Sequence, residues 1–255
     1  MDTLYVLLPC YNEELNIGDL IEDWMKQEKG INEAGYVLKI RPVNDCSTDH
    51  TREVILEKQE KYPDHVRIID HEVNKNLCGV LNTSIAFFEE NGKENDLMCL
   101  MDGDNTHNPE YIHSMLKKLN DHCDCVIASR YREGADVVGL SGIRKFMSDG
   151  ARIYYTIMLN VPNVRDYTCG YRVYKKSAID RLVKQFGQEP IKEKTFACMM
   201  EFLYKLYLSG AKFDEVGFKL RYDKKQGESK MKVGKTMINS LKTALKLRCL
   251  PKGGK

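Results

Sequence analysis

Two aspartates separated by one glycine, Asp102 and Asp104, directly follow the unbroken apolar run at residues 97–101. Such a run, without alternation, is typical of a strand buried on both faces of a parallel sheet. Ligands in open α/β sheets bind just beyond the carboxyl ends of these strands. Mg2+ and Mn2+ prefer oxygen ligands and usually share them with substrate phosphates. The pattern predicts a divalent-metal site at the two aspartates, although a surface Asp-Gly-Asp turn also fits the tripeptide alone.

The elements that would position this site alternate along the chain. Apolar runs that predict strands lie at residues 4–9, 36–43, 66–69, 97–101 and 126–128, and helical spacing lies between them. This alternation indicates parallel strands joined by crossover helices in a doubly wound layer. We therefore expect an α/β fold with a mainly parallel sheet flanked by helices. One domain would span residues 1–233, and a basic amphipathic tail would span residues 234–255.

Composition narrows the class of protein. Hydrophobic residues make up 42% and charged residues 30% of the 255 residues, as in soluble globular proteins. No run of eighteen apolar residues occurs, so no membrane-spanning helix is expected. The odd number of scattered cysteines, nine, indicates a reducing cytosol rather than a disulfide framework. Residues 219–255 hold twelve Lys or Arg against two Asp or Glu, which suggests a negatively charged partner.

Other signatures of nucleotide-binding and hydrolytic proteins are missing. No G-x-G-x-x-G follows the first predicted strand, which argues against a dinucleotide dehydrogenase. The Gly-Lys-Thr at residues 234–236 lacks the spacing of a P-loop and no buried strand precedes it. No Ser-His-Asp pattern stands out, and the six dispersed histidines suit surface or packing positions better than ligand positions.

Six segments follow one another in an order found in a known family. Residues 7–13 resemble its PxYNE opening, 43–49 its VDDGSxD segment, 74–83 its NxGLGxALNxG segment and 102–104 its metal motif. Residues 166–174 resemble DxTxGyRvy, and residues 215–230 resemble EvPixxxxRxxGxSK. Over residues 4–235 the chain is thus similar to the inverting family 2 glycosyltransferases of GT-A fold. The likeness is greatest to the polyprenyl-phosphate glycosyltransferases, a group that includes dolichol-phosphate mannose synthases.

The resemblance implies a donor site. Asp104 would bind Mn2+ or Mg2+ directly, and Asp102 would bind metal or ribose, while Thr106 stands where some relatives supply a glutamine ligand. Asn76 replaces a usual glycine, and asparagine tolerates the left-handed conformation. Lys224 replaces an arginine, which keeps the charge but loses the bidentate fork. The implied nucleotide-binding residues are Pro9, Tyr11, Glu13, Asp45, Asp102 and Lys230.

The resemblance also implies an acceptor site. In the lipid-phosphate relatives, the arginines matching Arg130 and Arg144 face the acceptor phosphate, although isolated arginines are often solvated or paired. Arg172 fits a structural pair with Asp166 as well as a phosphate contact. Glu201 fits a helix-start charge as well as an acceptor-side base. The implied acceptor-binding residues are Arg130, Arg144, Asp166, Arg172 and Glu201, and the implied catalytic residues are Asp102, Asp104, Arg130, Arg144 and Lys224.

Three functions stay open at this point. The first is transfer of a sugar from a GDP- or UDP-sugar to a polyprenyl phosphate, which needs positive residues to align the acceptor rather than a base. The second is transfer to a saccharide or other hydroxyl, which needs a carboxylate base such as Glu201 or Asp166. The third is nucleotide-sugar binding without turnover, with a membrane protein as partner. No nucleic-acid partner is expected.

The predicted tail suggests a route to the acceptor. Its apolar residues recur at helical spacing, and lysines flank them. A basic amphipathic helix can lie on an anionic membrane surface, so we expect a peripheral enzyme at the cytoplasmic face. Packing of the apolar stripe on the protein itself is an equal alternative. The stripe consists of Met237, Ile238, Leu241, Ala244, Leu245 and Arg248, and the lysines are Lys235, Lys242 and Lys246.

Overall fold

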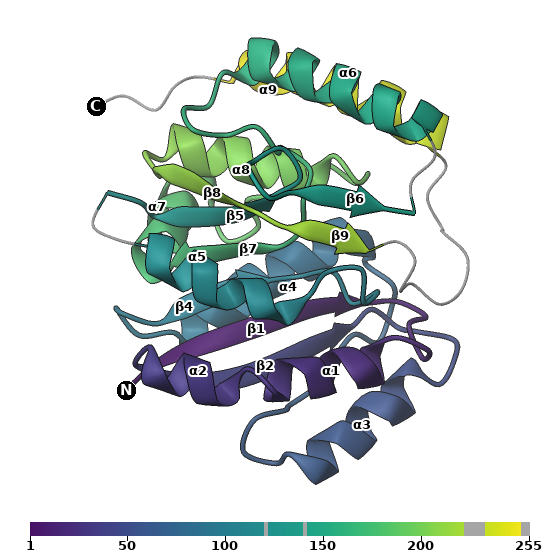
Figure 1. The fold of residues 1–255 in the computed structure, drawn as a ribbon, viewed down its shortest axis with the longest axis vertical. Coiled ribbons are helices and arrows are strands. Elements are labelled where there is room, and N and C mark those ends of the chain that lie inside the picture. The colour runs from purple at the N-terminus through teal and green to yellow at the C-terminus, as the bar shows by residue number, and fades with distance from the viewer. Residues whose placement is uncertain (120–121, 140–141, 222–232, 251–255) are drawn as a thin grey trace.

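A seven-stranded sheet forms the centre of the molecule in the computed structural model (Figure 1). The structure describes residues 1–119, 122–139, 142–221 and 233–250, without the side chains at 142–147 and 233–238. Within these residues the strand order is β3-β2-β1-β4-β7-β5-β8. The strands are β1 (Asp2–Cys10), β2 (Tyr36–Asn44), β3 (Ile69–Asp70), β4 (Leu97–Leu100), β5 (Cys125–Ser129), β7 (Arg172–Lys175) and β8 (Phe213–Gly217).

The sheet is mainly parallel, which confirms the expected fold class. β1 pairs in parallel with β2 and β4, β2 with β3, and β5 with β8. β7 was not foreseen, and it runs antiparallel between β4 and β5. The loop before β7 explains this direction, because Gly170 lies against Asp102 at the carboxyl end of β4. A strand that starts at that edge must run back across the sheet.

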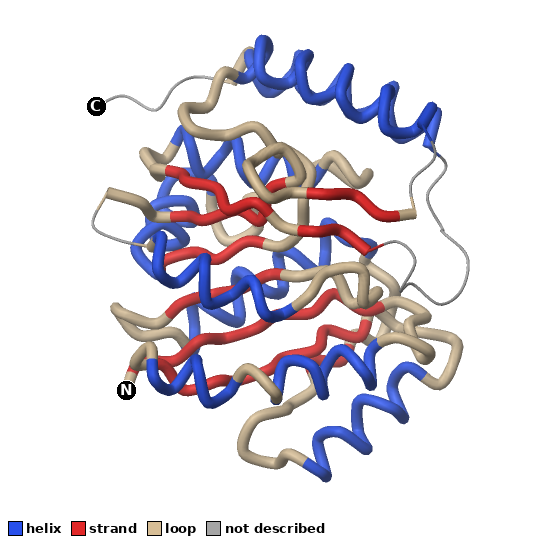
Figure 2. The backbone as a smooth tube through the Cα atoms, in the orientation of Figure 1, coloured by secondary structure: helices blue, strands red, loops and turns tan. Residues whose placement is uncertain are grey.

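Helices cover the sheet on both sides (Figure 2). Two long helices, one behind the other in Figure 1, pack together at one end of the molecule. α4, α7 and α8 pack in succession, and α9 packs on α6 and α8. The described part of the predicted tail therefore lies against the rest of the fold. A second small sheet pairs β6 (Asp136–Val138) with β9 (Lys219–Arg221) in parallel. The helices are α1 (Ile17–Met25), α2 (Glu28–Glu33), α3 (Thr51–Lys61), α4 (Asn76–Asn91), α5 (Ile112–Lys118), α6 (Gly142–Leu159), α7 (Lys176–Phe186), α8 (Cys198–Leu208) and α9 (Val233–Arg248), with a 3-10 turn η1 (Pro109–Tyr111).

Burial follows the apolar runs in the sequence. Every residue of β4 is buried, as expected for a central strand covered on both faces. Trp24 on α1 is fully buried and meets the ring of Tyr171 edge-on, with 6.2 Å between the ring centroids. This contact ties α1 to the segment that precedes β7. Among the described helices, none is long and apolar enough to cross a membrane.

Candidate functional site

The carboxyl ends of β1, β2 and β4 bring three of the sequence motifs to one edge of the sheet. Cys10 pairs with Asn44, and Leu7 pairs with Leu100, so the loops that follow these strands are neighbours. The backbone N–H of Asp45 donates to the carbonyl of Cys10 at 2.8 Å, which joins the first two loops directly. The parallel register of β1, β2 and β4 thus brings together three motifs that are far apart in the sequence.

Each of these loops turns through a residue in the left-handed conformation. The φ angles are 53° at Asn12, 57° at Cys46 and 57° at Asn105, and Asn76 at the start of α4 has φ of 59°. The predicted tolerance of Asn76 for this conformation is therefore confirmed. Asparagine adopts it readily, whereas cysteine does so at some cost. Strained turns concentrated on one edge are typical of a binding site.

Asp102 and Asp104 lie half-buried in the loop that leaves β4. A Cβ atom on Gly103 would come within 2.6 Å of the carbonyl oxygen of Pro9, so only glycine lets this loop cross β1 so closely. A Cβ atom on Gly170 would come within 2.5 Å of Asp102 Oδ1. Gly103 therefore lets the loop that carries the aspartates lie against β1, and Gly170 lets the backbone before β7 approach Asp102.

The two carboxylates fit a divalent cation that is shared with a substrate. Within the described part of the chain, no group of three or more His, Cys, Asp or Glu side chains could hold a metal alone. Mg2+ is commonly held by one or two carboxylates together with substrate phosphates and water. The Thr106 hydroxyl, where some relatives have a glutamine, donates to Asp104 Oδ1 at 2.7 Å. Thr106 thus donates a hydrogen bond to the candidate metal ligand Asp104.

Asp45 is almost completely buried and organises the start of α4. Its Oδ1 accepts hydrogen bonds from His71 Nδ1 at 2.7 Å and from the backbone N–H of Lys75 at 2.8 Å. His71 Nε2 lies 2.9 Å from the Thr83 hydroxyl on α4. This role of His71 was not predicted, because no local spacing in the sequence links it to Asp45. The predicted contact of Asp45 with a nucleotide base stays a prediction.

The remaining residues of the opening motif lie at the same edge. Tyr11 is 40% exposed, so its ring is accessible to a ligand. Glu13 Oε2 accepts from the Asn16 side chain at 2.9 Å, and the Glu13 backbone N–H donates to Thr51 Oγ1 at 2.7 Å. Pro9 is the last but one residue of β1. Their predicted donor contacts stay predictions.

Arg130 and Asp166 form a bidentate ion pair. Arg130 Nε and Nη2 donate to the two Asp166 oxygens at 2.8 and 2.6 Å, and Nη2 also donates to Thr168 Oγ1. The Asp166 side chain is 0% exposed and that of Arg130 is 16% exposed. Burial alone would raise the pKa of Asp166, but the Arg130 charge and hydrogen bonds outweigh it and lower that pKa.

Two predicted acceptor-binding residues, Arg172 and Glu201, are buried and bind other groups of the protein. Arg172 is fully buried in β7 and donates to the carbonyls of Met199 and Tyr167, so neither the predicted phosphate contact nor the alternative pair with Asp166 is present. A central strand flanked on both sides explains its burial. Glu201 is also buried: its Oε1 accepts from Lys205 Nζ at 2.6 Å. Glu201 Oε2 accepts from two backbone N–H groups of the preceding loop.

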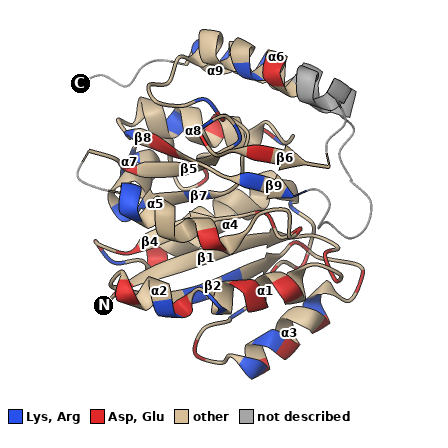
Figure 3. Cartoon of the chain, viewed as in Figure 1, with Lys and Arg blue, Asp and Glu red and all other residues tan. Residues whose placement is uncertain are grey.

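Three predicted site residues lie outside the described residues or side chains. Lys224 and Lys230 belong to the segment 222–232, and Arg144 is near the start of α6, where side chains are not described. Basic residues do recur on the neighbouring described elements, β9 and α9 (Figure 3). The roles of these three residues stay predictions.

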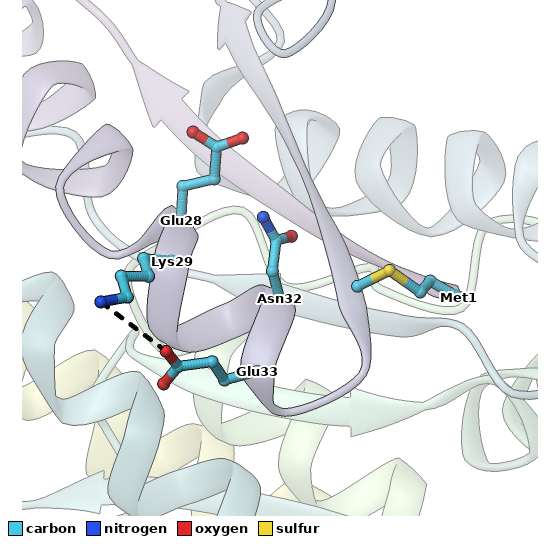
Figure 4. A pocket seen from close by; sticks show the side chains of 5 residues that line it. All are labelled: Met1, Glu28, Lys29, Asn32 and Glu33. Carbon is cyan, nitrogen blue, oxygen red and sulfur yellow. Dashed lines mark ion pairs between the residues drawn. The ribbon is translucent and has the colours of Figure 1, made fainter.

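Two of the hollows on the described surface differ in their distance from the site. One of about 600 Å³ opens between the start of α4 and the loop at residues 188–194, and Lys75, Lys192 and Lys194 are among its lining residues. It adjoins the site, because the Lys75 backbone binds Asp45. The other, of about 640 Å³, lies between Met1 and α2 (Figure 4). Met1 precedes β1, whereas the aspartates follow the carboxyl end of the parallel strand β4, at the opposite edge of the sheet. The Lys29–Glu33 pair of this second hollow is long, at 4.0 Å, and we assign it no role in the chemistry.

Comparison with known proteins agrees with this arrangement. A dolichol-phosphate mannosyltransferase of Pyrococcus furiosus is 30% identical over 243 residues, which are 95% of this chain and 62% of the relative. This chain thus spans less than two thirds of that protein. An undecaprenyl-phosphate mannosyltransferase of Micrococcus luteus is 25% identical over 245 residues, which are 95% of this chain and 94% of the relative.

A solved structure shows the same fold. Glucosyl-3-phosphoglycerate synthase from Mycobacterium tuberculosis, in complex with Mn2+, UDP and phosphoglyceric acid, superposes with a TM-score of 0.68 at 15% identity. The match covers 99% of this chain and 81% of that one, which supports the GT-A fold. The sequence model of glycosyl transferase family 2 matches residues 5–183. With its motifs gathered at one edge of a GT-A sheet, the chain belongs to glycosyl transferase family 2.

Proposed function

We propose that this chain transfers a sugar from a nucleoside diphosphate sugar to the phosphate of a polyprenyl phosphate, with inversion and with a divalent metal. The observation that carries the proposal is the pair of carboxylates, Asp102 and Asp104, at the end of buried β4. The two named polyprenyl-phosphate mannosyltransferases support this acceptor class and make mannose the first sugar to test.

In the proposed reaction, one bond to the anomeric carbon of the sugar forms and another breaks. An acceptor phosphate oxygen bonds to that carbon as its bond to the diphosphate breaks, so negative charge collects on the leaving diphosphate. Asp102 and Asp104 would hold a divalent cation, which would neutralise that charge. Lys224 and Lys230 would add positive charge from the segment 222–232. Asp45 and Tyr11 would hold the base at the neighbouring loops.

The carboxylates favour a phosphate acceptor over a hydroxyl acceptor. A phosphate is already anionic near neutral pH and needs alignment rather than deprotonation. Asp166 and Glu201, the candidate bases for a hydroxyl, both have internal cationic partners, in Arg130 and Lys205. We propose that Arg144 aligns the acceptor phosphate and that the exposed part of Arg130 assists it.

The full chain should transfer sugar to a short-chain polyprenyl phosphate when Mn2+ or Mg2+ is present. A panel of GDP- and UDP-linked sugars, with mannose included, identifies the donor by the glycolipid formed. Slow donor hydrolysis without any glycolipid would indicate a nucleotide-sugar-binding protein instead. Transfer to soluble saccharides but not to the lipid phosphate would contradict the proposed acceptor.

We also propose that α6 and α9 face the membrane surface that carries the acceptor. Of the predicted stripe, Ala244 is buried and Leu245 is 50% exposed, whereas Leu247, which is not part of the stripe, is also buried. The face of α9 that packs inward therefore only overlaps the predicted stripe. The two helices are joined where Arg248 Nη1 donates to the carbonyl of Met158 at 2.8 Å. The same pair of helices exposes apolar and basic side chains: Ile153 and Ile157 on α6, and Lys242, Leu245, Lys246 and Arg248 on α9.

Charge reversal of α9 should weaken binding to anionic vesicles. A lysine near an anionic surface contributes about 1 kcal/mol, so Lys242→Glu/Lys246→Glu should lower vesicle affinity at least about tenfold at low salt. Deleting α9 would uncover α6 and α8, so substitution is the better test. Lys29→Glu/Lys117→Glu makes the same charge change on α2 and α5 and should matter much less. Equal loss in both double variants would contradict a specific role of α9.

A further inference from the structure

A chain of hydrogen bonds runs from Asp104 to the segment before β7. Thr106 Oγ1 donates to Asp104 Oδ1 at 2.7 Å, and the Thr106 backbone N–H reaches the same oxygen at 3.2 Å. His107 Nδ1 lies 3.2 Å from Thr106 Oγ1, and Cys169 Sγ lies 3.6 Å from His107 Nε2. Four side chains thus connect two distant parts of the sequence, through contacts that are partly buried at Asp104 and buried at His107 and Cys169.

The chemistry of the groups gives this chain one direction. The Thr106 hydroxyl proton points to the carboxylate, which only accepts, so the hydroxyl oxygen accepts from His107 Nδ1–H. His107 Nε2 then carries a lone pair and accepts from the Cys169 thiol. Burial raises the pKa of Cys169 strongly, so the thiol keeps its proton. Each donor in the chain has one acceptor.

Aromatic rings hold His107 in place. Its ring stacks on Phe218 with 5.3 Å between centroids and 12° between planes, and it meets Tyr171 edge-on at 6.0 Å. The residue is only 5% exposed. An imidazole fixed on its faces and at both nitrogens cannot rotate to serve a ligand. It can transmit the position of one segment to another.

The segment at residues 166–170 contacts Asp102 directly and is connected to Asp104 through two intervening side chains. Gly170 lies against the Asp102 carboxylate, and Cys169 reaches Asp104 through His107 and Thr106. Asp166, in the same segment, holds Arg130. One short stretch of backbone therefore connects the carboxylates to the acceptor-side arginine.

We propose that Thr106, His107 and Cys169 are positioning residues that fix the orientation of the Asp104 carboxylate and thereby the affinity of the site for its divalent cation. This inference rests on the proposed function. Rotation of the Asp104 carboxylate would break the bond from Thr106, which His107 and Cys169 hold in place. Partners of this kind typically change metal affinity 10- to 100-fold when they are removed.

Binding of Mn2+ tests the proposal without an acceptor. Mn2+ affinity is measured by the electron paramagnetic resonance signal of free Mn2+, in the presence of UDP or GDP, with the full chain. Thr106→Val removes the hydroxyl while keeping the shape, and should weaken Mn2+ binding about 10- to 100-fold. Thr106→Ser restores a hydroxyl and should bind Mn2+ much like the wild type. Thermal melting of each variant shows that it is folded.

A second pair of variants separates the two nitrogens of His107. His107→Asn keeps an amide near the Nδ1 position and can still donate to Thr106, whereas His107→Gln places its amide near the Nε2 position. Both lose the ring contacts with Phe218 and Tyr171, so this loss cannot account for a difference between them. We expect weaker Mn2+ binding in His107→Gln than in His107→Asn.

The outcomes are distinct. If Thr106→Val is folded and binds Mn2+ like the wild type, the positioning role is wrong, and the proposed function stands. If Thr106→Ser is as weak as Thr106→Val, the hydroxyl is not the group that matters, which also overturns the proposal. If the wild type binds no Mn2+ with either nucleotide, both the inference and the metal-dependent function fail.

Discussion

Asp104→Asn should abolish most metal-dependent nucleotide binding and lower the transfer rate by about a hundredfold or more. The substitution removes one of two carboxylate charges at the end of β4 and preserves the shape of the side chain. An amide oxygen can still accept from Thr106, so the loop should keep its conformation. The loss is therefore expected in the chemistry rather than in stability. Calorimetry with GDP or UDP, with and without EDTA, and the rate of glycolipid formation measure it.

A matched control makes the same chemical change at a remote carboxylate. Asp64→Asn, on an exposed loop after α3, should leave both nucleotide binding and rate near wild-type values. Nucleotide affinity that is unchanged by EDTA, or that survives in Asp104→Asn, would contradict the assignment of the metal site. A fall in melting temperature for Asp104→Asn alone would point to a structural role of this carboxylate.

The sheet edge and its loops followed from local sequence. An apolar run of β4 length needs cover on both faces, and parallel strands bring their carboxyl ends together, so Asp102 was placed correctly at that edge. Asn76 was expected to tolerate a left-handed turn, and its φ of 59° confirms this. These features depend on short stretches of chain, which a single sequence shows directly.

Side-chain partners did not follow from the sequence. Arg130 and Arg172 were assigned from motif position, and Glu201 from its place at the start of a predicted helix. Neither kind of evidence gives the direction of a side chain. The antiparallel entry of β7 buries Arg172 between β4 and β5, and that direction depends on the path of the loop before it. Asp166 takes Arg130 as its partner instead. Such pairing depends on tertiary packing, because Arg130 and Asp166 are 36 residues apart in the sequence.

Buried histidines were missed for a related reason. Each of His71 and His107 reads in the sequence as a packing residue, and both are indeed buried. Their hydrogen bonds reach Asp45 and Thr106, which hold the turns of the site. The second partner of His107 is Cys169, which is 62 residues away in the sequence, so no local spacing could reveal this contact.

Asp166→Asn is expected to destabilise the fold by about 3 kcal/mol, because it leaves the largely buried Arg130 guanidinium without its countercharge. The amide also turns a donor toward Arg130 in place of one carboxylate oxygen. Asp214→Asn breaks the exposed pair with Lys118 and should cost no more than about 1 kcal/mol. Urea unfolding at neutral pH measures both changes.

Two further measurements test the cause of that loss. Arg130→Met/Asp166→Asn removes the buried charge as well, so the double variant should be more stable than Asp166→Asn alone. The pKa of Asp166 is lowered in the fold, so its stabilisation is present above its ordinary value of 3.8 and is lost as pH falls through the lower folded-state value. The stability gap between wild type and Asp166→Asn should therefore hold at neutral pH and narrow only below about 3.8. A double variant less stable than Asp166→Asn, or a gap that narrows already near neutral pH, would show that the ion pair is not the source of the stability.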